Sequence, residues 1–350
     1  MPLSQKMGWT EHTHERRGHP TNTTILTSDA LGPAIRALRE GQVVAFPTET
    51  VYGLGADGLN DAACRRIFVA KGRPSDNPLI LHVLGPEDLE GLVAELPVAA
   101  QRLIAAFWPG PLTVVVPATE KVPLSVRAGL DTVAVRAPSH PVARRLIAGL
   151  GSPIAAPSAN LSGRPSPTTA SAVYEDMRGR IPFIVDGGSA EVGLESTVVD
   201  CTTQPVTLLR AGGIGRGRLC DVVGEVVIAT ANSPVRSPGM KYRHYAPKSP
   251  LIWVQSTDDA FVRRILPDIV SAHRRWALIA PDVMKGLQAS WFYGLGSDDV
   301  SAAHRLFDAM RTMDQHNPDA IVVIWESQGG LGLAISNRLE KASGRRVMPE

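Results

Sequence analysis

Short aliphatic runs alternate with amphipathic stretches along most of the chain, beginning at Thr23. Short apolar, β-branched runs bounded by turn residues are typical of buried strands, whereas apolar residues at every third or fourth position indicate helices. In residues 23–228 this pattern predicts strands at 43–46, 79–83, 112–116, 133–136, 181–185, 198–200 and 206–209. The helices expected between them cover 31–40, 61–70, 98–107, 140–148 and 169–177.

The same alternation restarts near Leu251 and continues almost to the end of the chain. Strands are expected at 251–254, 276–279 and 320–325, and helices at 259–270, 302–315 and 333–343. A regular alternation of strand and helix is typical of a parallel sheet. We therefore expect residues 250–350 to form a smaller, Rossmann-like parallel α/β domain.

Residues 229–249 interrupt the pattern between the two α/β parts. They contain Pro, Ser and basic residues without periodicity, which is typical of a linker. The segment is also dense in Tyr, His, Lys and Arg, so we expect a lid rather than an inert spacer. Residues 1–22 are polar and are predicted to be a disordered tail, and the His12, His14 and His19 cluster fits a solvated tail better than a metal site.

Composition limits the classes of protein that the chain can belong to. Its 350 residues fit two domains, and 36 Lys and Arg against 34 Asp and Glu give a net charge of +2. That balance does not favour binding nucleic acid by bulk charge. No apolar run approaches the ~18–20 residues of a membrane span. The three cysteines are far apart and the start lacks an apolar signal core, so we expect a cytoplasmic protein.

Gly53-Leu54-Gly55-Ala56-Asp57-Gly58 matches the dinucleotide-binding pattern GxGxxG. That fingerprint needs its first glycine at the turn from a strand into a helix, so that the helix start meets the pyrophosphate. Six residues separate Gly53 from the preceding predicted strand. We therefore expect a glycine-rich loop shaped for close backbone approach. The P-loop pattern GxxxxGK[ST] and the hydrolase pattern GxSxG are absent.

A basic loop follows the second predicted helix, with the sequence Lys71-Gly72-Arg73-Pro74-Ser75-Asp76-Asn77-Pro78. Two cations flank a glycine, and the prolines stiffen the segment, so Lys71 and Arg73 could bind a polyphosphate while Asn77 fixes the loop. A solvated basic turn is the alternative. His82 follows on the next predicted strand.

Polar or cationic residues also stand at the ends of several predicted strands. Arg136 closes the strand before Ala137-Pro138, where it could bind a carboxylate ligand or form an internal salt bridge. Arg210 ends a strand in the same way, and Ser196 enters one. The segment 155–168 places hydroxyl and amide groups between prolines. An ordinary Ser/Pro loop without a binding role is the alternative interpretation. Together these groups favour a site for a nucleotide and a small acid.

Six motifs of the first part resemble the YrdC-like family. They are PTETVYGLG (47–55), KGRPSDNPL (71–79) with His82, WPGPLT (108–113), DTVAVR (131–136), SANLSGRPSPT (158–168) and ESTVVD (195–200). SPGMKYRHYAP (237–247), with the α/β region ending in KASG (341–344), resembles the long, two-domain threonylcarbamoyl-AMP synthases of that family. The resemblance implies a twisted mixed α/β sheet for the catalytic part.

The activity implied by the resemblance converts L-threonine, bicarbonate and ATP into threonylcarbamoyl-AMP, pyrophosphate and water. Mg²⁺ would enter with the ATP phosphates, without metal ligands from the protein. Partner proteins would transfer the threonylcarbamoyl group to tRNA, with which this chain would make a weak contact at most.

The resemblance also implies two sets of binding residues. The threonine set is Thr50, His82, Arg136, the Ala156 backbone and Ser196. The ATP set is Arg73, Asn77, Thr132, Ser158, Ser166, Arg210 and Tyr245. Lys71 and Arg73 would be the catalytic residues.

Two other functions are open at this point. An RNA-binding module could use a related single-domain fold, but the net charge and the lack of stacking aromatic motifs disfavour it. Carbamoyl-adenylate chemistry in hydrogenase maturation uses a similar domain, but the acylphosphatase-like and zinc-finger modules expected with it are missing here.

Overall fold

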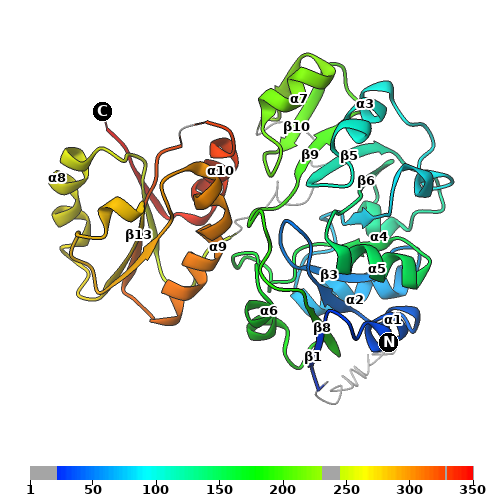
Figure 1. Ribbon diagram of the computed structural model, residues 1–350, viewed down its shortest axis with the longest axis horizontal. Helices are drawn as coiled ribbons and strands as arrows, with labels where there is room; N and C mark the ends of the chain where they lie inside the picture. The colour runs from blue at the N-terminus through cyan, green and yellow to red at the C-terminus, as the bar shows by residue number, and fades with distance from the viewer. Residues whose placement is uncertain (1–21, 231–244, 328, 350) are drawn as a thin grey trace, which may run out of the picture.

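The computed structural model describes residues 22–230, 245–327 and 329–349. Within these ranges the chain forms two α/β parts that lie beside each other (Figure 1). The elements of the first part are β1 (Thr24–Thr27), α1 (Gly32–Arg39), β2 (Val44–Phe46), β3 (Gly53–Asp57), α2 (Asp61–Lys71), β4 (Ile80–His82), η1 (Pro86–Leu89), α3 (Val98–Phe107), β5 (Leu112–Pro117), α4 (Leu124–Arg127), β6 (Thr132–Arg136), α5 (Pro141–Leu150), β7 (Ile154–Ala156), α6 (Ala170–Met177), β8 (Phe183–Asp186), β9 (Thr197–Asp200), β10 (Val206–Arg210), α7 (Arg216–Val223) and β11 (Val226–Ile228).

One mixed sheet forms the core of the first part. In the part of the chain that the structure describes, its eleven strands run in the order β1-β8-β2-β3-β7-β4-β6-β5-β9-β10-β11. Strand β4 is parallel to β6 and antiparallel to β7. The register pairs His82 with Arg136 and Ile80 with Ala156. Side chains predicted from separate motifs therefore lie next to one another in the middle of the sheet.

Helices cover both faces of this sheet, and the alternation of side chains along β2 shows why. Val44 and Phe46 are buried on the face covered by α1 and α5. Ala45 points to the opposite face and joins the larger core beneath α2, α3 and α6. Successive strand residues face opposite sides, so an uninterrupted apolar run such as β2 fits a sheet that is covered twice.

The glycine-rich segment that begins at Gly53 is a strand, β3, and not the loop that the sequence predicted. A Cβ atom at Gly55 would lie 2.6 Å from both the Phe46 ring and the Ile154 side chain. No real Cβ approaches that closely, so the position needs glycine. Close packing between neighbouring strands, and not phosphate binding, therefore accounts for Gly55.

The second part is a parallel five-stranded sheet with the order β14-β13-β15-β12-β16 in the described residues. Helix α8 packs on one face, while α9 and α10 pack on the face turned toward the first part (Figure 1). Strands β14 and β16 were not predicted, because one is only half-buried and the other is a short, mostly exposed Arg-rich segment. The elements of the second part are β12 (Leu251–Val254), α8 (Asp259–Val270), β13 (Trp276–Ala280), η2 (Asp282–Met284), β14 (Trp291–Gly294), α9 (Asp299–Gln315), β15 (Ala320–Ile324), α10 (Gly332–Ala342) and β16 (Arg345–Val347).

The predicted fold class, a mixed-sheet α/β part followed by a smaller parallel α/β part, is confirmed. Among the described residues, no helix is both long and apolar enough to cross a membrane. Nearly all of the predicted tail, 1–22, lies outside the described residues, and so does the portion 231–244 of the predicted linker and lid.

Candidate active site

A cavity of about 710 Å³, including its open mouth, lies in the first part where β4, β6 and β7 meet. Segments far apart in the sequence supply its walls. Ten of the residues predicted for the site line it, namely Thr50, Lys71, Arg73, His82, Arg136, Ala156, Ser158, Ser196, Arg210 and Tyr245.

Arg136 is buried in one wall of the cavity and already has protein partners. Its Nη2 lies 2.6 Å from Oε1 of Glu49, and its Nη1 donates to the Thr50 hydroxyl at 2.9 Å. Its Nε donates to the Gly110 carbonyl at 3.2 Å. An arginine carries five N–H donors, so these three contacts leave donors for a ligand. The internal salt bridge left open by the sequence is therefore present, and Arg136 also faces the cavity.

His82 lies beside Arg136 and is held as a neutral ring. Burial, with a further effect of the Arg136 charge, lowers the pKa of His82 to about 3. Nδ1 faces the carbonyls of Ile80 and Ile154 at 3.1 and 3.3 Å, so this nitrogen carries the proton. Nε2 is then a hydrogen-bond acceptor. A neutral acceptor beside a cation suits a ligand that carries both a carboxylate and a donor.

Lys71 is the last residue of α2, and its ammonium reaches across to the loop after β7. The Nζ atom donates to the Ser158 carbonyl at 2.5 Å and the Asn160 carbonyl at 2.6 Å. Burial and the nearby Arg73 charge lower the pKa of Lys71 well below its ordinary value. An ammonium group has three donors, so one N–H remains for a ligand in the cavity.

Two arginines join Lys71 in the cavity wall. Arg73 Nη2 donates to the Asn77 and Pro78 carbonyls at 3.1 Å each, while its buried Nε has no hydrogen-bond partner among the residues that the structure describes. Burial lowers the pKa of Arg73 to about 10. Arg210 donates from Nη2 to the hydroxyl and the carbonyl of Ser196, each at 3.0 Å. Three cations that line one cavity fit a polyanionic ligand, which would offset their repulsion.

Three predicted residues do not line the cavity. Asn77 is buried, and within the described ranges its side-chain amide has no hydrogen-bond partner, while its backbone carbonyl accepts from Arg73. Thr132 is buried at the start of β6, opposite Pro117. Ser166 is fully buried and donates to Glu195 Oε1. In the structure these three residues support the wall instead of facing the cavity.

Neither Glu49 nor Glu195 was predicted as a site residue, although both lie in motifs that resemble the family. Glu195 lines the cavity and binds both Ser166 and Arg338, with Oε2 at 2.9 Å from Arg338 Nη2. Burial would raise the pKa of Glu195, but Arg338 and Arg210 hold it below its ordinary value. Both residues lie in motifs that also contain predicted site residues, and this position in the sequence could have indicated them.

Residues of the second part pack against Tyr245, which lines this cavity. Tyr245 belongs to the predicted linker and lid, 229–249, and is its first described residue after 231–244. It is buried and has a φ of 67°, which is the left-handed region. Its ring packs against Phe307 of α9 at 5.3 Å, and the Arg338 guanidinium lies 5.4 Å from the ring centre. A tyrosine in this backbone region is strained, and strained residues cluster at functional sites.

The donor set of the cavity does not favour a metal ion bound by the protein alone. Among the residues that the structure describes, no three His, Cys, Asp or Glu side chains lie together as metal ligands would. Glu49 and Glu195 are each paired with an arginine. A Mg²⁺ ion that arrives with phosphate oxygens and water needs no such cluster.

Comparison with known families shows to which class of protein this fold and this cavity belong. The family model Sua5_yciO_yrdC, described as "Telomere recombination", matches residues 36–212. The model described as "Threonylcarbamoyl-AMP synthase, C-terminal domain" matches residues 214–344. The chain belongs to the Sua5/YciO/YrdC family, in the form that carries this C-terminal domain. The resemblance found in the sequence is thereby confirmed.

Similar proteins align over almost the whole chain. The threonylcarbamoyl-AMP synthase of Pyrococcus abyssi is 47% identical over 317 residues, covering 89% of this chain and 93% of that protein. The Bacillus subtilis protein of the same name is 43% identical over 326 residues, covering 91% and 94%. The crystal structure of P. abyssi Sua5 complexed with L-threonine matches with a TM-score of 0.89 at 44% identity, covering 94% of this chain and 100% of that one.

Proposed function

We propose that this chain is an L-threonylcarbamoyladenylate synthase, a nucleotidyltransferase that converts L-threonine, bicarbonate and ATP into threonylcarbamoyl-AMP, pyrophosphate and water. The observation that carries the proposal is one cavity in which Arg136 and His82 lie together while Lys71, Arg73 and Arg210 supply further cations. The names of the relatives and the threonine-bound P. abyssi structure support the same activity.

In this proposal one group of residues binds threonine. The remaining N–H groups of Arg136 pair with the threonine carboxylate, and neutral His82 accepts a hydrogen bond through Nε2. Thr50 is already held by Arg136 at 2.9 Å, and Ser196 by Arg210 at 3.0 Å. Their hydroxyls, with the Ala156 backbone, complete a polar pocket for the amino acid.

The other group binds ATP. Lys71, Arg73 and Arg210 neutralise the phosphates, and each hydrogen bond from a charged donor contributes ~1.5–3 kcal/mol. Ser158 and Tyr245 contact the nucleotide, while Asn77, Thr132 and Ser166 fix the segments around it. A Mg²⁺ ion that arrives with ATP would be held by phosphate oxygens and water, and it would add positive charge beside Lys71, Arg73 and Arg210.

The chemistry needs alignment and charge neutralisation more than a protein nucleophile. The threonine amine and bicarbonate form an N-carboxylate and release water. An oxygen of that carboxylate attacks the α-phosphorus of ATP, and the bond to pyrophosphate breaks. Lys71 and Arg73 stabilise the charge on the phosphates during this step. Both the N-carboxylate and the mixed anhydride react with water, so the buried Tyr245 at the cavity wall has a protective role.

The remaining parts of the proposal concern the setting of the enzyme. We infer a catalytic domain at 23–228, a linker and lid at 229–249, and a C-terminal domain at 250–350. The product would pass to proteins that transfer the threonylcarbamoyl group to tRNA in the cytoplasm, with weak tRNA contact by this chain.

Pyrophosphate release tests the proposal. The wild-type chain should release pyrophosphate from ATP when threonine and bicarbonate are both present, and much more slowly when either is left out. Arg73→Ala should abolish both ATP binding and pyrophosphate release while leaving the fold intact. The matched control is Arg65→Ala, an exposed arginine of the neighbouring helix α2. Normal ATP affinity in Arg73→Ala would refute the assignment of the basic loop.

A further inference from the structure

Arg311 belongs to α9 of the second part, yet its guanidinium is buried against the first part. Its Nη2 donates to Asp176 Oδ2 at 2.7 Å and to the Pro165 carbonyl at 2.6 Å, and its Nε donates to the same carbonyl at 3.1 Å. The Arg311 residue is only 4% exposed. A buried arginine is stable only with such partners.

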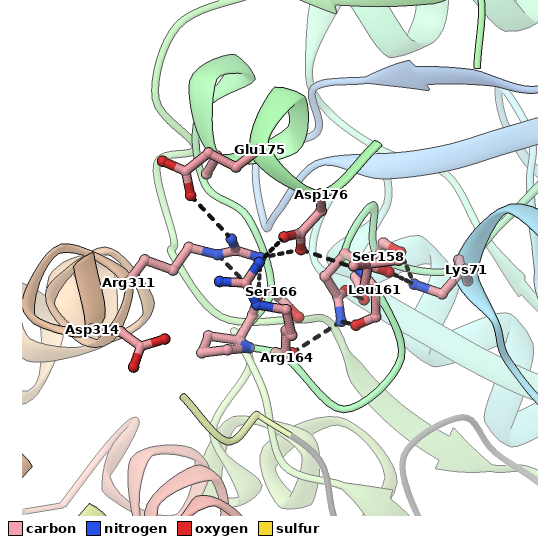
Figure 2. Close-up of polar contacts among 12 residues, drawn as sticks. Lys71, Ser158, Leu161, Arg164, Ser166, Glu175, Asp176, Arg311 and Asp314 are labelled. Atoms are coloured by element: carbon pink, nitrogen blue, oxygen red, sulfur yellow. Dashed lines mark hydrogen bonds and ion pairs between the residues drawn. The ribbon is translucent and has the colours of Figure 1, made fainter. Parts of the chain in front are cut away.

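Asp176 links this arginine to the loop that follows β7. Its side chain is fully buried and binds Arg164 through Oδ1, while Oδ2 also accepts the Leu161 N–H at 3.1 Å. Figure 2 shows Asp176 between the guanidinium of Arg311 and the loop. A carboxylate on α6 and an arginine on α9 therefore hold the same loop from outside the cavity.

The contacts continue from this loop to Lys71. The Asn160 side chain donates to the Arg164 carbonyl at 2.9 Å, and the Asn160 carbonyl accepts from Lys71 Nζ at 2.6 Å. Ser158, Asn160 and Arg164 all line the cavity. A continuous series of hydrogen bonds and ion pairs thus joins α9 to the cationic part of the cavity. Figure 2 shows part of this series.

We propose that Arg311 is a positioning residue for the nucleotide: through Asp176 and Pro165 it holds the loop 158–166 in the shape that binds ATP. The inference rests on the proposed function, because it assigns a role in that same site to a residue of the second part. The threonine contacts at Arg136 and His82 lie outside this series. Loss of Arg311 therefore affects ATP and spares threonine.

Steady-state kinetics with Arg311→Gln, Arg311→Lys and Asp176→Asn tests the inference. Networks of this kind carry couplings that correspond to changes of ~2–30-fold. We expect Arg311→Gln to raise the KM for ATP by about tenfold while the KM for threonine stays within about twofold. Arg311→Lys keeps the charge but loses the planar guanidinium, so its KM for ATP should lie between that of the wild type and that of Arg311→Gln. Asp176→Asn should act like Arg311→Gln, and the double variant should be little worse than either single one.

Amide hydrogen exchange gives a readout that does not depend on activity. The Leu161 N–H, which is bonded to Asp176, should exchange faster in Arg311→Gln than in the wild type. The matched control is Arg305→Gln, an arginine of the same helix that contacts Gly294 and Asp282 of the second part. It should leave both KM values and the exchange rate unchanged.

Three results would overturn the inference. One is unchanged exchange of the Leu161 amide in a folded Arg311→Gln. Another is an equal rise in both KM values, which indicates general loss of structure. The third is a wild-type KM for ATP in both the Lys and the Gln variants. If Arg311→Gln does not fold, Arg311→Lys and Asp176→Asn decide the matter. Absence of threonine-dependent turnover in the wild type would refute the proposed function, whereas the exchange data would still decide the role of Arg311.

Discussion

Glu49 and Arg136 form a buried ion pair, with Oε1 and Nη2 2.6 Å apart, in the wall of the cavity. Burial alone would raise the pKa of Glu49, yet the charge and hydrogen bonding of Arg136 hold it below its ordinary value. The carboxylate therefore stays ionised and fixes the arginine. A ligand carboxylate bound by the remaining donors of Arg136 would share this cation with Glu49.

Glu49→Gln should lower the free energy of unfolding, and the stability of the variant should depend more on bound threonine than that of the wild type. Removing one partner of a buried ion pair costs ~3–5 kcal/mol, because the other charge is left uncompensated. Threonine would supply the missing carboxylate, so saturating threonine should raise the free energy of unfolding more in the variant than in the wild type. Urea unfolding with and without threonine measures both quantities.

The control for this experiment is Asp61→Asn, which breaks an exposed pair with Arg65. Exposed pairs contribute ~0.2–1 kcal/mol, so little should change. Equal stabilisation of wild type and Glu49→Gln by threonine would show that Arg136 does not bind the ligand carboxylate.

Much of the fold could be predicted because local patterns decide it. Helices α2 and α3 have clear apolar periodicity, and β5 and β6 are buried apolar runs, so their positions follow from the sequence within a residue or two. Strand β3 was missed because glycine disfavours strands, and its need for glycine comes from Phe46 and Ile154, which approach it only in the folded sheet. Local propensity carries no information about such a contact.

The site shows the same division. Lys71, Arg73 and Arg136 stand out locally, as cations beside glycine or at the end of an apolar strand. Arg311 and Arg338 lie in ordinary amphipathic helices, where an arginine reads as a solvated surface residue. Their burial depends on how the two parts of the chain pack, which no local pattern of charge or apolar residues predicts.

The activity should fall as the pH rises, and this fall should occur at a pH well below the pKa of an ordinary lysine. Burial and Arg73 lower the pKa of Lys71, so it loses its charge as the pH rises through that lowered pKa. Because the charged form binds phosphate, kcat/KM for ATP should fall in that range. Lys71→Arg keeps its charge and should lose this fall. Lys121→Arg, outside the cavity, is the control, and an unchanged alkaline fall in Lys71→Arg would contradict the assignment.

His82 should make the protein less stable in acid. Its pKa is about 3 in the folded chain, against ~6.5 when unfolded. Between these values the unfolded state binds a proton that the folded state does not, so stability falls as the pH falls. His82→Asn removes this effect, and its free energy of unfolding should drop by ~2 kcal/mol less than that of the wild type between pH ~7 and ~5. Urea unfolding at both values measures the difference, and equal drops would show that His82 is not buried as a neutral ring.

If one cavity joins threonine, bicarbonate and ATP into a single adenylate, the carbon of bicarbonate must appear in the product. Mass spectrometry of the product formed from isotopically labelled bicarbonate measures this. We expect a threonylcarbamoyl-AMP ion that carries the label from bicarbonate and is missing when Arg73→Ala replaces the wild type. Pyrophosphate release without a labelled adenylate, or a labelled adenylate from Arg73→Ala at the wild-type rate, would contradict it.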